Sequence, residues 1–272
     1  MKIARDLKVG LALGGGAARG LAHLGVIRAL ERLGVRLDAI AGVSTGSMIA
    51  AAYAAGVPLD QLLPVARRVS WKQLGSFTFN LHGFHSNKRM EQFLASFMPV
   101  RTFEELKIPL RILATDLRSG QTVVLEKGDL FTAIRASCAI PGLYVPVEIG
   151  DWLLADGYLT CNLPVQYVRQ MGVDVVIASA IGLQINHDIA FTNMYQILMR
   201  SFSIMSASVQ RASFPTADVV IRPPVEEYIW SDLRSADKLV EAGERATLEK
   251  SKEIEAALNP SFWKRWTAVS RA

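Results

Sequence analysis

Ser44 has the sequence surroundings of a nucleophile. The segment GVSTG, residues 42–46, lies directly between an apolar run and a helix-forming stretch of small residues. A serine exposed on a sharp strand-to-helix turn needs glycine two positions before and after it, here Gly42 and Gly46, because those residues almost touch. The turn would hold the Ser44 hydroxyl at the positive end of the following helix. The pattern predicts a nucleophile elbow, and a plain glycine-rich turn is the alternative interpretation.

Three consecutive glycines, Gly14, Gly15 and Gly16, follow the first apolar run. Cleavage of an ester passes through a tetrahedral oxyanion, and a well-placed backbone N–H lowers that barrier by about 3 to 4 kcal/mol. We therefore expect these glycines to form an oxyanion hole at the sheet edge that carries Ser44. Two phosphate-binding loops are excluded, because Arg19 occupies the third glycine position of a dinucleotide fingerprint and the Gly-Lys-Ser/Thr of a P-loop is missing.

A serine nucleophile needs a base, and none of the four histidines has sequence neighbours that would orient it. Each is interpreted as a structural or surface residue: His23, His82, His85 and His187. Asp156 is the better candidate, because LLADGYLTCNLPV places it at a strand end and Gly157 permits close approach of the backbone. Alternatively, Asp-Gly is simply a turn. Asp116 is the second choice, and a role in the turn that follows it is the favoured interpretation.

The elements that must carry these residues alternate between short apolar runs and longer helical patterns. This alternation is typical of a mostly parallel sheet covered by helices, so we expect an α/β fold with three α/β/α layers. The expected strands cover residues 9–14, 37–44, 109–117, 121–128, 173–180 and 217–223, with a hairpin at 145–157. No linker or repeat interrupts the pattern, which indicates one domain over residues 1–272, with a core at about 8–225 and a C-terminal helix and tail at 235–272.

Helices are expected between these strands. The clearest cover residues 17–34, 45–56 and 129–142, with Gly34 closing the first and Asp129 as the N-cap of the last.

Two further helical segments have features that bear on a binding site. Residues 59–98 are interpreted as two helices joined by an irregular loop at 74–88, whose aromatic residues favour a lid or the lip of a site. A helix at 190–210 carries Met194, Met199 and Met205 at helical spacing. We interpret this methionine stripe as core, with an acyl-chain channel as the alternative.

Composition and charge limit the class of protein. Half of the 272 residues are hydrophobic and 20% are charged, which is typical of a globular protein. Cys138 and Cys161 are too few for a disulfide scaffold and lack metal-ligand spacing, so we expect no metal and a reducing compartment. The net charge of +5 favours anionic partners. Because no dense basic run along an expected strand or helix is interleaved with aromatic residues, an acidic membrane surface is favoured over nucleic acid.

The N-terminal segment and the longest apolar stretch predict a cytoplasmic protein, soluble or peripheral on the membrane. Residues 1–16 contain the acidic Asp6 and break at glycine, unlike a signal peptide. Residues 38–57 are interrupted by glycines and hydroxyl residues, and therefore make a poor membrane span.

Four blocks together resemble the patatin-like phospholipase family, in particular its bacterial members and the catalytic domain of neuropathy target esterase. In chain order they are GGGAARG, GVSTGS, ASCAIPGLYVPV and DGYLTCNLPV, and the similarity extends over residues 10 to about 180. The resemblance implies a dyad without histidine, in which Ser44 is the nucleophile and Asp156 its base. It also implies that Gly14, Gly15 and Gly16 donate to the oxyanion and that Arg19 holds their loop in shape.

The resemblance further implies a substrate class and a chemistry. The substrate would be a phospholipid or lysophospholipid, cleaved through an acyl-enzyme without a metal or organic cofactor, and burial beside an acyl channel would raise the pKa of Asp156. Tyr158 stands where the family more often has glycine or alanine, and we expect its ring to narrow the acyl pocket. The alternatives are an acyltransferase or a small-ester carboxylesterase on the same dyad, and a non-catalytic lipid-binding module.

The C-terminal segment SFWKRW combines three aromatic residues, Phe262, Trp263 and Trp266, with two cationic ones. This combination suits the headgroup region of an anionic membrane, and packing of the aromatic rings onto the fold is the alternative.

Removal of residues 259–272 tests this interpretation. We expect the shortened chain to co-sediment less with vesicles that contain anionic lipid, because it has lost both aromatic and cationic contacts. The measurement compares the bound fractions of the full and shortened chains at equal lipid concentration. Equal fractions would favour the alternative, in which the aromatic rings of the tail pack onto the folded protein.

Overall fold

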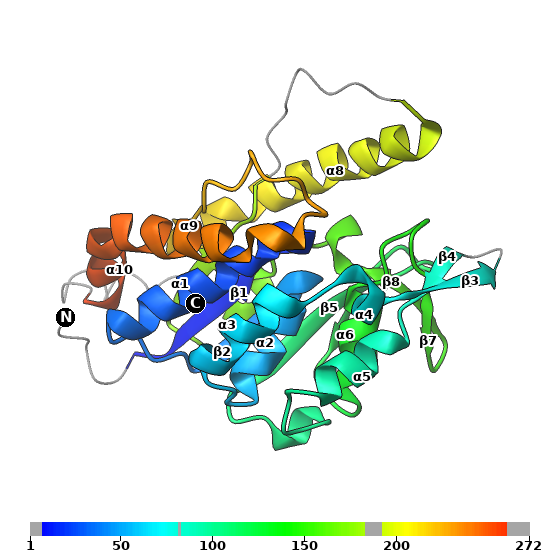
Figure 1. The fold of residues 1–272 in the computed structure, drawn as a ribbon. Helices are drawn as coiled ribbons and strands as arrows, with labels where there is room; N and C mark the ends of the chain where they lie inside the picture. The colour runs from blue at the N-terminus through cyan, green and yellow to red at the C-terminus, as the bar shows by residue number, and fades with distance from the viewer. Residues whose placement is uncertain (1–6, 81–82, 183–191, 260–272) are drawn as a thin grey trace.

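The computed structural model describes residues 7–80, 83–182 and 192–259, and a mixed sheet of eight strands organises them (Figure 1). The strand order is β10-β9-β1-β2-β5-β8-β7, and β6 pairs with β5 off this path. The pairs from β10 to β5 are parallel, whereas β6 and β8 run antiparallel to β5 and β7 runs antiparallel to β8. The strands are β1 (Val9–Leu13), β2 (Ala39–Val43), β5 (Leu110–Asp116), β6 (Thr122–Leu125), β7 (Val147–Ile149), β8 (Trp152–Asp156), β9 (Val175–Ser179) and β10 (Val219–Ile221).

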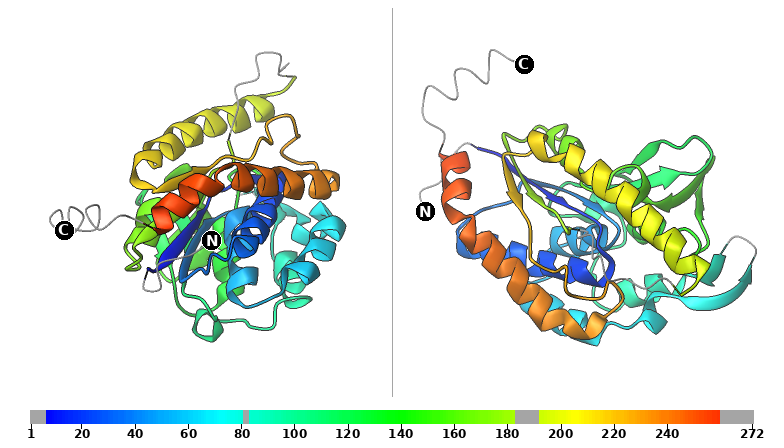
Figure 2. Two further views of the ribbon diagram at one scale, coloured as in Figure 1. Left: turned by 90° about the vertical axis from the view of Figure 1, so that its left-hand side faces the viewer. Right: turned by 90° about the horizontal axis from the view of Figure 1, so that it is seen from above.

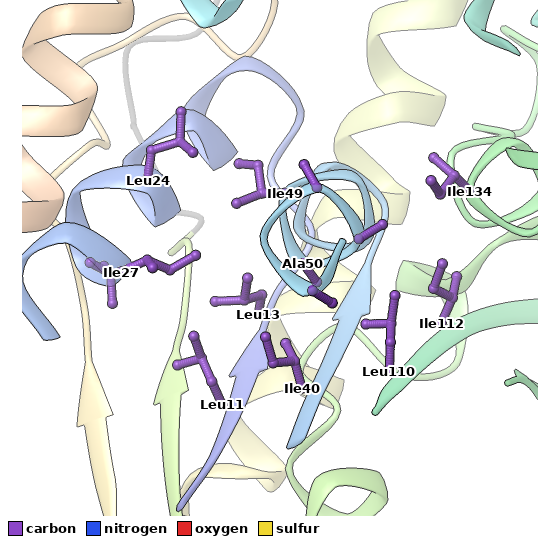
Figure 3. Close-up of a cluster of buried hydrophobic side chains, with 14 of the residues drawn as sticks. Leu11, Leu13, Leu24, Ile27, Ile40, Ile49, Ala50, Leu110, Ile112 and Ile134 are labelled. Atoms are coloured by element: carbon purple, nitrogen blue, oxygen red, sulfur yellow. The ribbon is translucent and has the colours of Figure 1, made fainter. Parts of the chain in front are cut away.

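Helices cover both faces of this sheet, which confirms the expected α/β architecture. Alternate strand residues face opposite sides. Leu11, Leu13 and Ile40 pack under Ile49 of one helix and Leu24 of another (Figure 3). The helices of this face include α1 (Ala22–Arg32), α2 (Thr45–Ala54), α3 (Leu59–Arg68), α6 (Leu130–Ser137) and α9 (Ala236–Glu249). The opposite side, with Ala12, Val43 and Leu113 among others, packs against α7 (Val165–Arg169).

Local capping signals are confirmed. Residues 17–21 form a short 3-10 helix before α1, and Gly34 follows α1 with a φ of +77°, a left-handed conformation that suits glycine. The Asp129 side chain accepts a hydrogen bond from the Thr132 amide at 2.7 Å and caps α6.

The expectation of an irregular loop at residues 74–88 is wrong. α4 (Trp71–Leu74) ends where the segment begins, and the segment itself forms a two-stranded antiparallel hairpin of β3 (Ser76–Asn80) and β4 (Gly83–Ser86), after which α5 (Arg89–Ala95) follows. The sequence SFTFN alternates polar and apolar residues, which is the period of a strand. His82 lies outside the described residues.

The expectation that the methionine stripe is core is also wrong. In α8 (Met194–Ala212), Met194 is 75% exposed and Met205 is 63% exposed. The helix buries Ser206 and Gln210 instead, and the side-chain amide of Gln210 donates to the Ile181 carbonyl at 3.4 Å. Figures 1 and 2 show α8 along the outer edge of the molecule, and no other described element covers its apolar side.

The C-terminal helix expected within residues 235–272 is divided into α9 and α10 (Ser251–Leu258), with Lys250 between them. The tail that carries Phe262, Trp263 and Trp266 lies outside the described residues. No helix in the described part of the chain is long and apolar enough to cross a membrane.

Two glycines allow α1 and α9 to pack in backbone contact. A Cβ atom on Gly25 would lie 1.8 Å from the Val240 carbonyl oxygen, and one on Gly243 would lie 1.9 Å from the Ala22 carbonyl oxygen. Any side chain at either position would force the helices apart.

We expect Gly243→Ala to lower the free energy of unfolding by about 1 to 3 kcal/mol, the usual effect of overpacking. Urea denaturation measures the change, with Lys238→Ala on the exposed side of α9 as the control. Equal stability of the two variants would contradict this account of the helix contact.

Candidate active site

Ser44 occupies a strained turn between β2 and α2. Its φ is 53° and its ψ is −127°, a conformation that a residue with a side chain rarely adopts. A Cβ on Gly42 would lie 2.6 Å from the Ser47 Cα, and one on Gly46 would lie 2.6 Å from the Leu13 carbonyl oxygen. The two glycines thus allow the close backbone contacts that the turn requires.

Hydrogen bonds hold this turn in place. The Ser44 amide donates to Ser137 Oγ at 2.8 Å, and the Ser137 hydroxyl donates to the Leu113 carbonyl at 2.7 Å. The Ser47 hydroxyl donates to the Ser44 carbonyl at 2.7 Å. The elbow is therefore tied to α6, to the central strand β5 and to its own helix, which is how a strained conformation persists.

The sheet brings Asp156 to this turn from 112 residues away in the chain. β2 is parallel to β5 up to the pair Val43 and Leu113, and β8 is antiparallel to β5 down to the pair Asp156 and Ala114. Because β6 occupies the other edge of β5, β2 and β8 share one edge and meet end to end. The Ser44 hydroxyl donates to Asp156 Oδ2 at 2.7 Å.

The Asp156 carboxyl is fully buried. Burial raises its pKa to about 7, and the hydrogen bonds that it accepts from the Ser44 hydroxyl and from the Tyr158 amide, at 3.0 Å, oppose that rise. The backbone is fixed as well, since the Thr115 hydroxyl donates to the Asp156 carbonyl at 3.0 Å. A carboxylate in this setting is a far stronger base than an exposed aspartate, whose pKa is about 3.9.

His23 supports the glycine loop. Its ring is buried, and its nitrogens lie 2.8 Å from the Gly14 carbonyl oxygen and from Ser179 Oγ. Burial lowers the pKa of His23 to about 4, so the ring is neutral at pH 7. Because a carbonyl only accepts, Nε2 carries the proton and Nδ1 accepts from the Ser179 hydroxyl. His187 lies outside the described residues.

The three glycines differ in what their amides do. The Gly14 amide donates to the Ser179 carbonyl at 3.1 Å, and the Gly15 amide donates to Asn162 Oδ1 at 3.0 Å, so neither is available to a substrate. The amides of Gly16 and of the next residue, Ala17, have no acceptor among the described residues. The Gly14 and Gly15 amides are occupied because Ser179 and Asn162, about 150 residues away, supply acceptors. Of these two residues, the sequence pointed only to Asn162, through the block DGYLTCNLPV.

Ala17 and Arg19 belong to the same loop. Ala17 has a positive φ of 49°, and its carbonyl accepts a hydrogen bond from Thr45 Oγ1 at 2.9 Å, which ties the loop to the start of α2. Within the described residues, the buried Nε of Arg19 has no hydrogen-bond partner. Burial lowers the pKa of Arg19, and Glu226 partly offsets that effect. The side chains that hydrogen-bond to the loop are thus Thr45, His23 and Asn162, and Arg19 is not among them.

A narrow apolar cavity of about 60 Å³ lies in front of Ser44. Its walls come from the glycine loop, α2, α4 and the segment after α6, and include Ala17, Leu21, Met48, Leu74 and Ile140. Tyr158 is not among them, because it packs with the cluster on the opposite face of the sheet. The expectation that Tyr158 narrows this pocket is wrong: the chain turns at Gly157 and carries the ring away.

Asp116 has the turn role favoured for it. Its carboxylate accepts from the Ser119 hydroxyl at 2.6 Å and from the Leu153 amide at 3.1 Å, and these bonds, led by Ser119, lower its pKa to about 2. Among the described residues no group of three His, Cys, Asp or Glu side chains is arranged to hold a metal.

Comparison with known proteins places these features in a family. The profile of the family described as patatin-like phospholipase matches residues 11–169, which include the glycine loop, Ser44 and Asp156. The chain belongs to the patatin-like phospholipase family. The resemblance in the four sequence blocks is thereby confirmed.

Relatives extend the match beyond the family profile. This patatin-like chain is 28% identical over 264 residues to an uncharacterised NTE family protein of Mycobacterium tuberculosis strain H37Rv, covering 88% of the chain and 45% of the relative. It is 30% identical over 282 residues to the lysophospholipase NTE1 of Kluyveromyces lactis, covering 89% of the chain and 19% of the relative. The chain thus spans less than half the length of these curated relatives.

A solved structure shows the same patatin-like fold. The crystal structure of VipD from Legionella pneumophila matches with a TM-score of 0.61 at 14% identity, over 92% of this chain and 67% of VipD.

The buried carboxyl predicts a stability effect in this patatin-like protein. The folded state holds the Asp156 proton up to about pH 7, whereas the unfolded chain loses it near pH 3.9, so folding becomes less favourable as pH rises between these values. We expect Asp156→Asn to raise the free energy of unfolding at pH 8 by about 2 to 4 kcal/mol, and by less at pH 5.

Urea denaturation of the wild type and the variant at both pH values measures this effect. Asp151→Asn, in the exposed turn between β7 and β8, is the matched control. A variant that is less stable than the wild type at pH 8 would contradict the burial of an ionisable carboxyl.

Proposed function

We propose that this protein hydrolyses the carboxylic ester of phospholipids or lysophospholipids, with Ser44 as nucleophile and Asp156 as base. The observation that carries the proposal is the 2.7 Å hydrogen bond from the Ser44 hydroxyl to a fully buried carboxylate. The apolar cavity in front of Ser44 and membership of the patatin-like phospholipase family support an acyl ester as the substrate.

In the first half of the reaction, Ser44 Oγ bonds to the ester carbonyl carbon while its proton passes to Asp156 Oδ2. The carbonyl oxygen becomes an oxyanion, and the amides of Gly16 and Ala17 are the donors left for it. When the intermediate collapses, the bond to the alcohol oxygen breaks. The alcohol leaves with the proton from Asp156, and the acyl group remains on Ser44.

In the second half, water replaces the alcohol. Asp156 takes a proton from the water, whose oxygen bonds to the acyl carbon, and the oxyanion forms again at the same amides. Collapse releases the fatty acid and returns the proton to Ser44. An acceptor alcohol in place of water would make the enzyme an acyltransferase, and product analysis distinguishes the two.

The pKa of Asp156 explains how a dyad works without histidine. General-base catalysis is most effective when the pKa of the base lies near the working pH. Burial raises the pKa of Asp156 to about 7, which places this carboxylate in the range that a histidine normally serves.

Loss of either dyad member tests the proposal. We expect Ser44→Ala and Asp156→Asn to lower kcat/KM for lipid ester hydrolysis by about 10⁴-fold or more, because each removes a group that acts in the bond-making step. Mass spectrometry of a lipid panel measures the products, and Ser208→Ala on exposed α8 is the control. Hydrolysis by Ser44→Ala at the wild-type rate would overturn the proposal, and so would failure of the wild type to react with a fluorophosphonate serine probe.

The pH profile tests the assignment of the base. Because Asp156 must be ionised to accept the proton, kcat/KM is expected to rise about tenfold per pH unit below pH 7 and to level off above it. Stopped assays between pH 4.5 and 9 on a substrate without ionisable groups give the profile. A rate that is constant over this range would show that Asp156 is not the base.

A further inference from the structure

A second and larger cavity adjoins the one that contains Ser44. Its volume is about 650 Å³, and it lies between α4, the beginning of the β3–β4 hairpin and the loop that precedes α9. Trp71 and Tyr144 line both cavities and therefore form their common wall. The larger cavity is the approach to Ser44 from this side of the molecule.

The common wall is held rigidly. The Trp71 indole donates to the Ser231 carbonyl at 2.7 Å, and its ring meets that of Trp230 edge-on with centroids 6.1 Å apart. Gly75 packs against the Tyr144 ring so closely that a Cβ there would lie 2.6 Å from a ring carbon. These contacts preorganise the approach and fix the position of α4, which carries Lys72.

The larger cavity has a positive lining. Lys72 and Arg89 belong to it, and no Asp or Glu does. Neither cation forms an ion pair with any described residue. The acidic residue nearest in sequence to Arg89 is Glu91, and Glu91 pairs with Arg101 and Arg135 instead. Two uncompensated cations beside a cavity attract an anion, and phosphate oxygens accept readily from both side chains.

On its other side, the Ser44 cavity is continued by a second apolar space. Leu21, Met48 and Val69 line both it and the Ser44 cavity. This third space has a volume of about 50 Å³, and all its lining residues are apolar, among them Ile49 of α2, which Figure 3 shows facing the core, and Phe97. The two spaces have volumes of only about 50 and 60 Å³, so together they suit one hydrocarbon chain better than two side by side.

The three spaces therefore follow the order of groups in a molecule with one anion, one ester and one acyl chain. We propose that Lys72 and Arg89 bind the phosphate of a lysophospholipid, whose ester lies at Ser44 and whose acyl chain enters the apolar space behind it. This inference rests on the proposed function and names the substrate class of the same site. The phosphate subsite selects phosphorylated lipids over neutral monoacylglycerols.

A paired-substrate experiment tests the subsite. The substrates are a lysophosphatidylcholine and a monoacylglycerol with the same short acyl chain, both below their micelle concentrations. We expect the double variant Lys72→Gln/Arg89→Gln to raise KM for the lysophospholipid by roughly tenfold to a hundredfold, with kcat nearly unchanged, because a charge-assisted bond is lost at each position. Hydrolysis of the monoacylglycerol is expected to stay at the wild-type level.

Matched controls separate charge from structure. Lys88→Gln removes an exposed cation next to Arg89 that does not line the cavity. This variant should change KM for neither substrate. Lys72→Arg should keep the lysophospholipid KM near the wild-type value. If the double variant lost activity equally on both substrates, or lost none on either, the phosphate subsite would be overturned.

A binding arm keeps this test independent of turnover. Titration calorimetry with Ser44→Ala measures affinity for the same two lipids and for inorganic phosphate, before and after removal of the two cations. Preference for the lysophospholipid that disappears in the triple variant supports the subsite, even if no ester is cleaved and the proposed function fails. Inorganic phosphate that binds as tightly as the lysophospholipid would mean a free-phosphate site and would overturn the proposal.

Discussion

The meeting of two strands on one edge of β5 is the constraint on which the site depends. β2 runs along that edge in one direction and β8 in the other, and they end at neighbouring positions of β5, Leu113 and Ala114. Ser44 and Asp156 are the residues at those two strand ends. Their contact is thus set by backbone pairing, which is more rigid than a contact between loops, and β6 occupies the opposite edge of β5.

This arrangement has energetic costs that the surrounding structure offsets. Ser44 adopts a positive φ, and Asp156 loses its hydration in a fully buried position. Hydrogen bonds from the Tyr158 amide and the Ser44 hydroxyl replace part of the lost hydration of the carboxylate. Ser137 ties the elbow to β5. Both costs serve chemistry, because the first exposes the hydroxyl and the second raises the pKa of the carboxyl.

Local features of the site and fold could be predicted from the sequence. The spacing of Gly42 and Gly46 around Ser44 follows from the geometry of one turn, and Asp129 caps the helix that it precedes. Features that depend on contacts between distant segments could not be predicted. The Gly14 and Gly15 amides are occupied by Ser179 and Asn162, and no local pattern distinguishes them from Gly16. Met194 and Met205 are exposed because no other described element covers that side of α8. The periodicity of a helix predicts which residues share a face, but it does not predict what that face packs against.

The most direct test of the account is the protonation state of Asp156 itself. Infrared difference spectra of the wild type minus Asp156→Asn, recorded between pH 4 and 9, isolate the signal of this one carboxyl. The account predicts a protonated carboxylic acid below neutral pH that converts to carboxylate with a midpoint near 7. A carboxylate already ionised at pH 5 would contradict it, because Asp156 would then be too weak a base for a dyad without histidine.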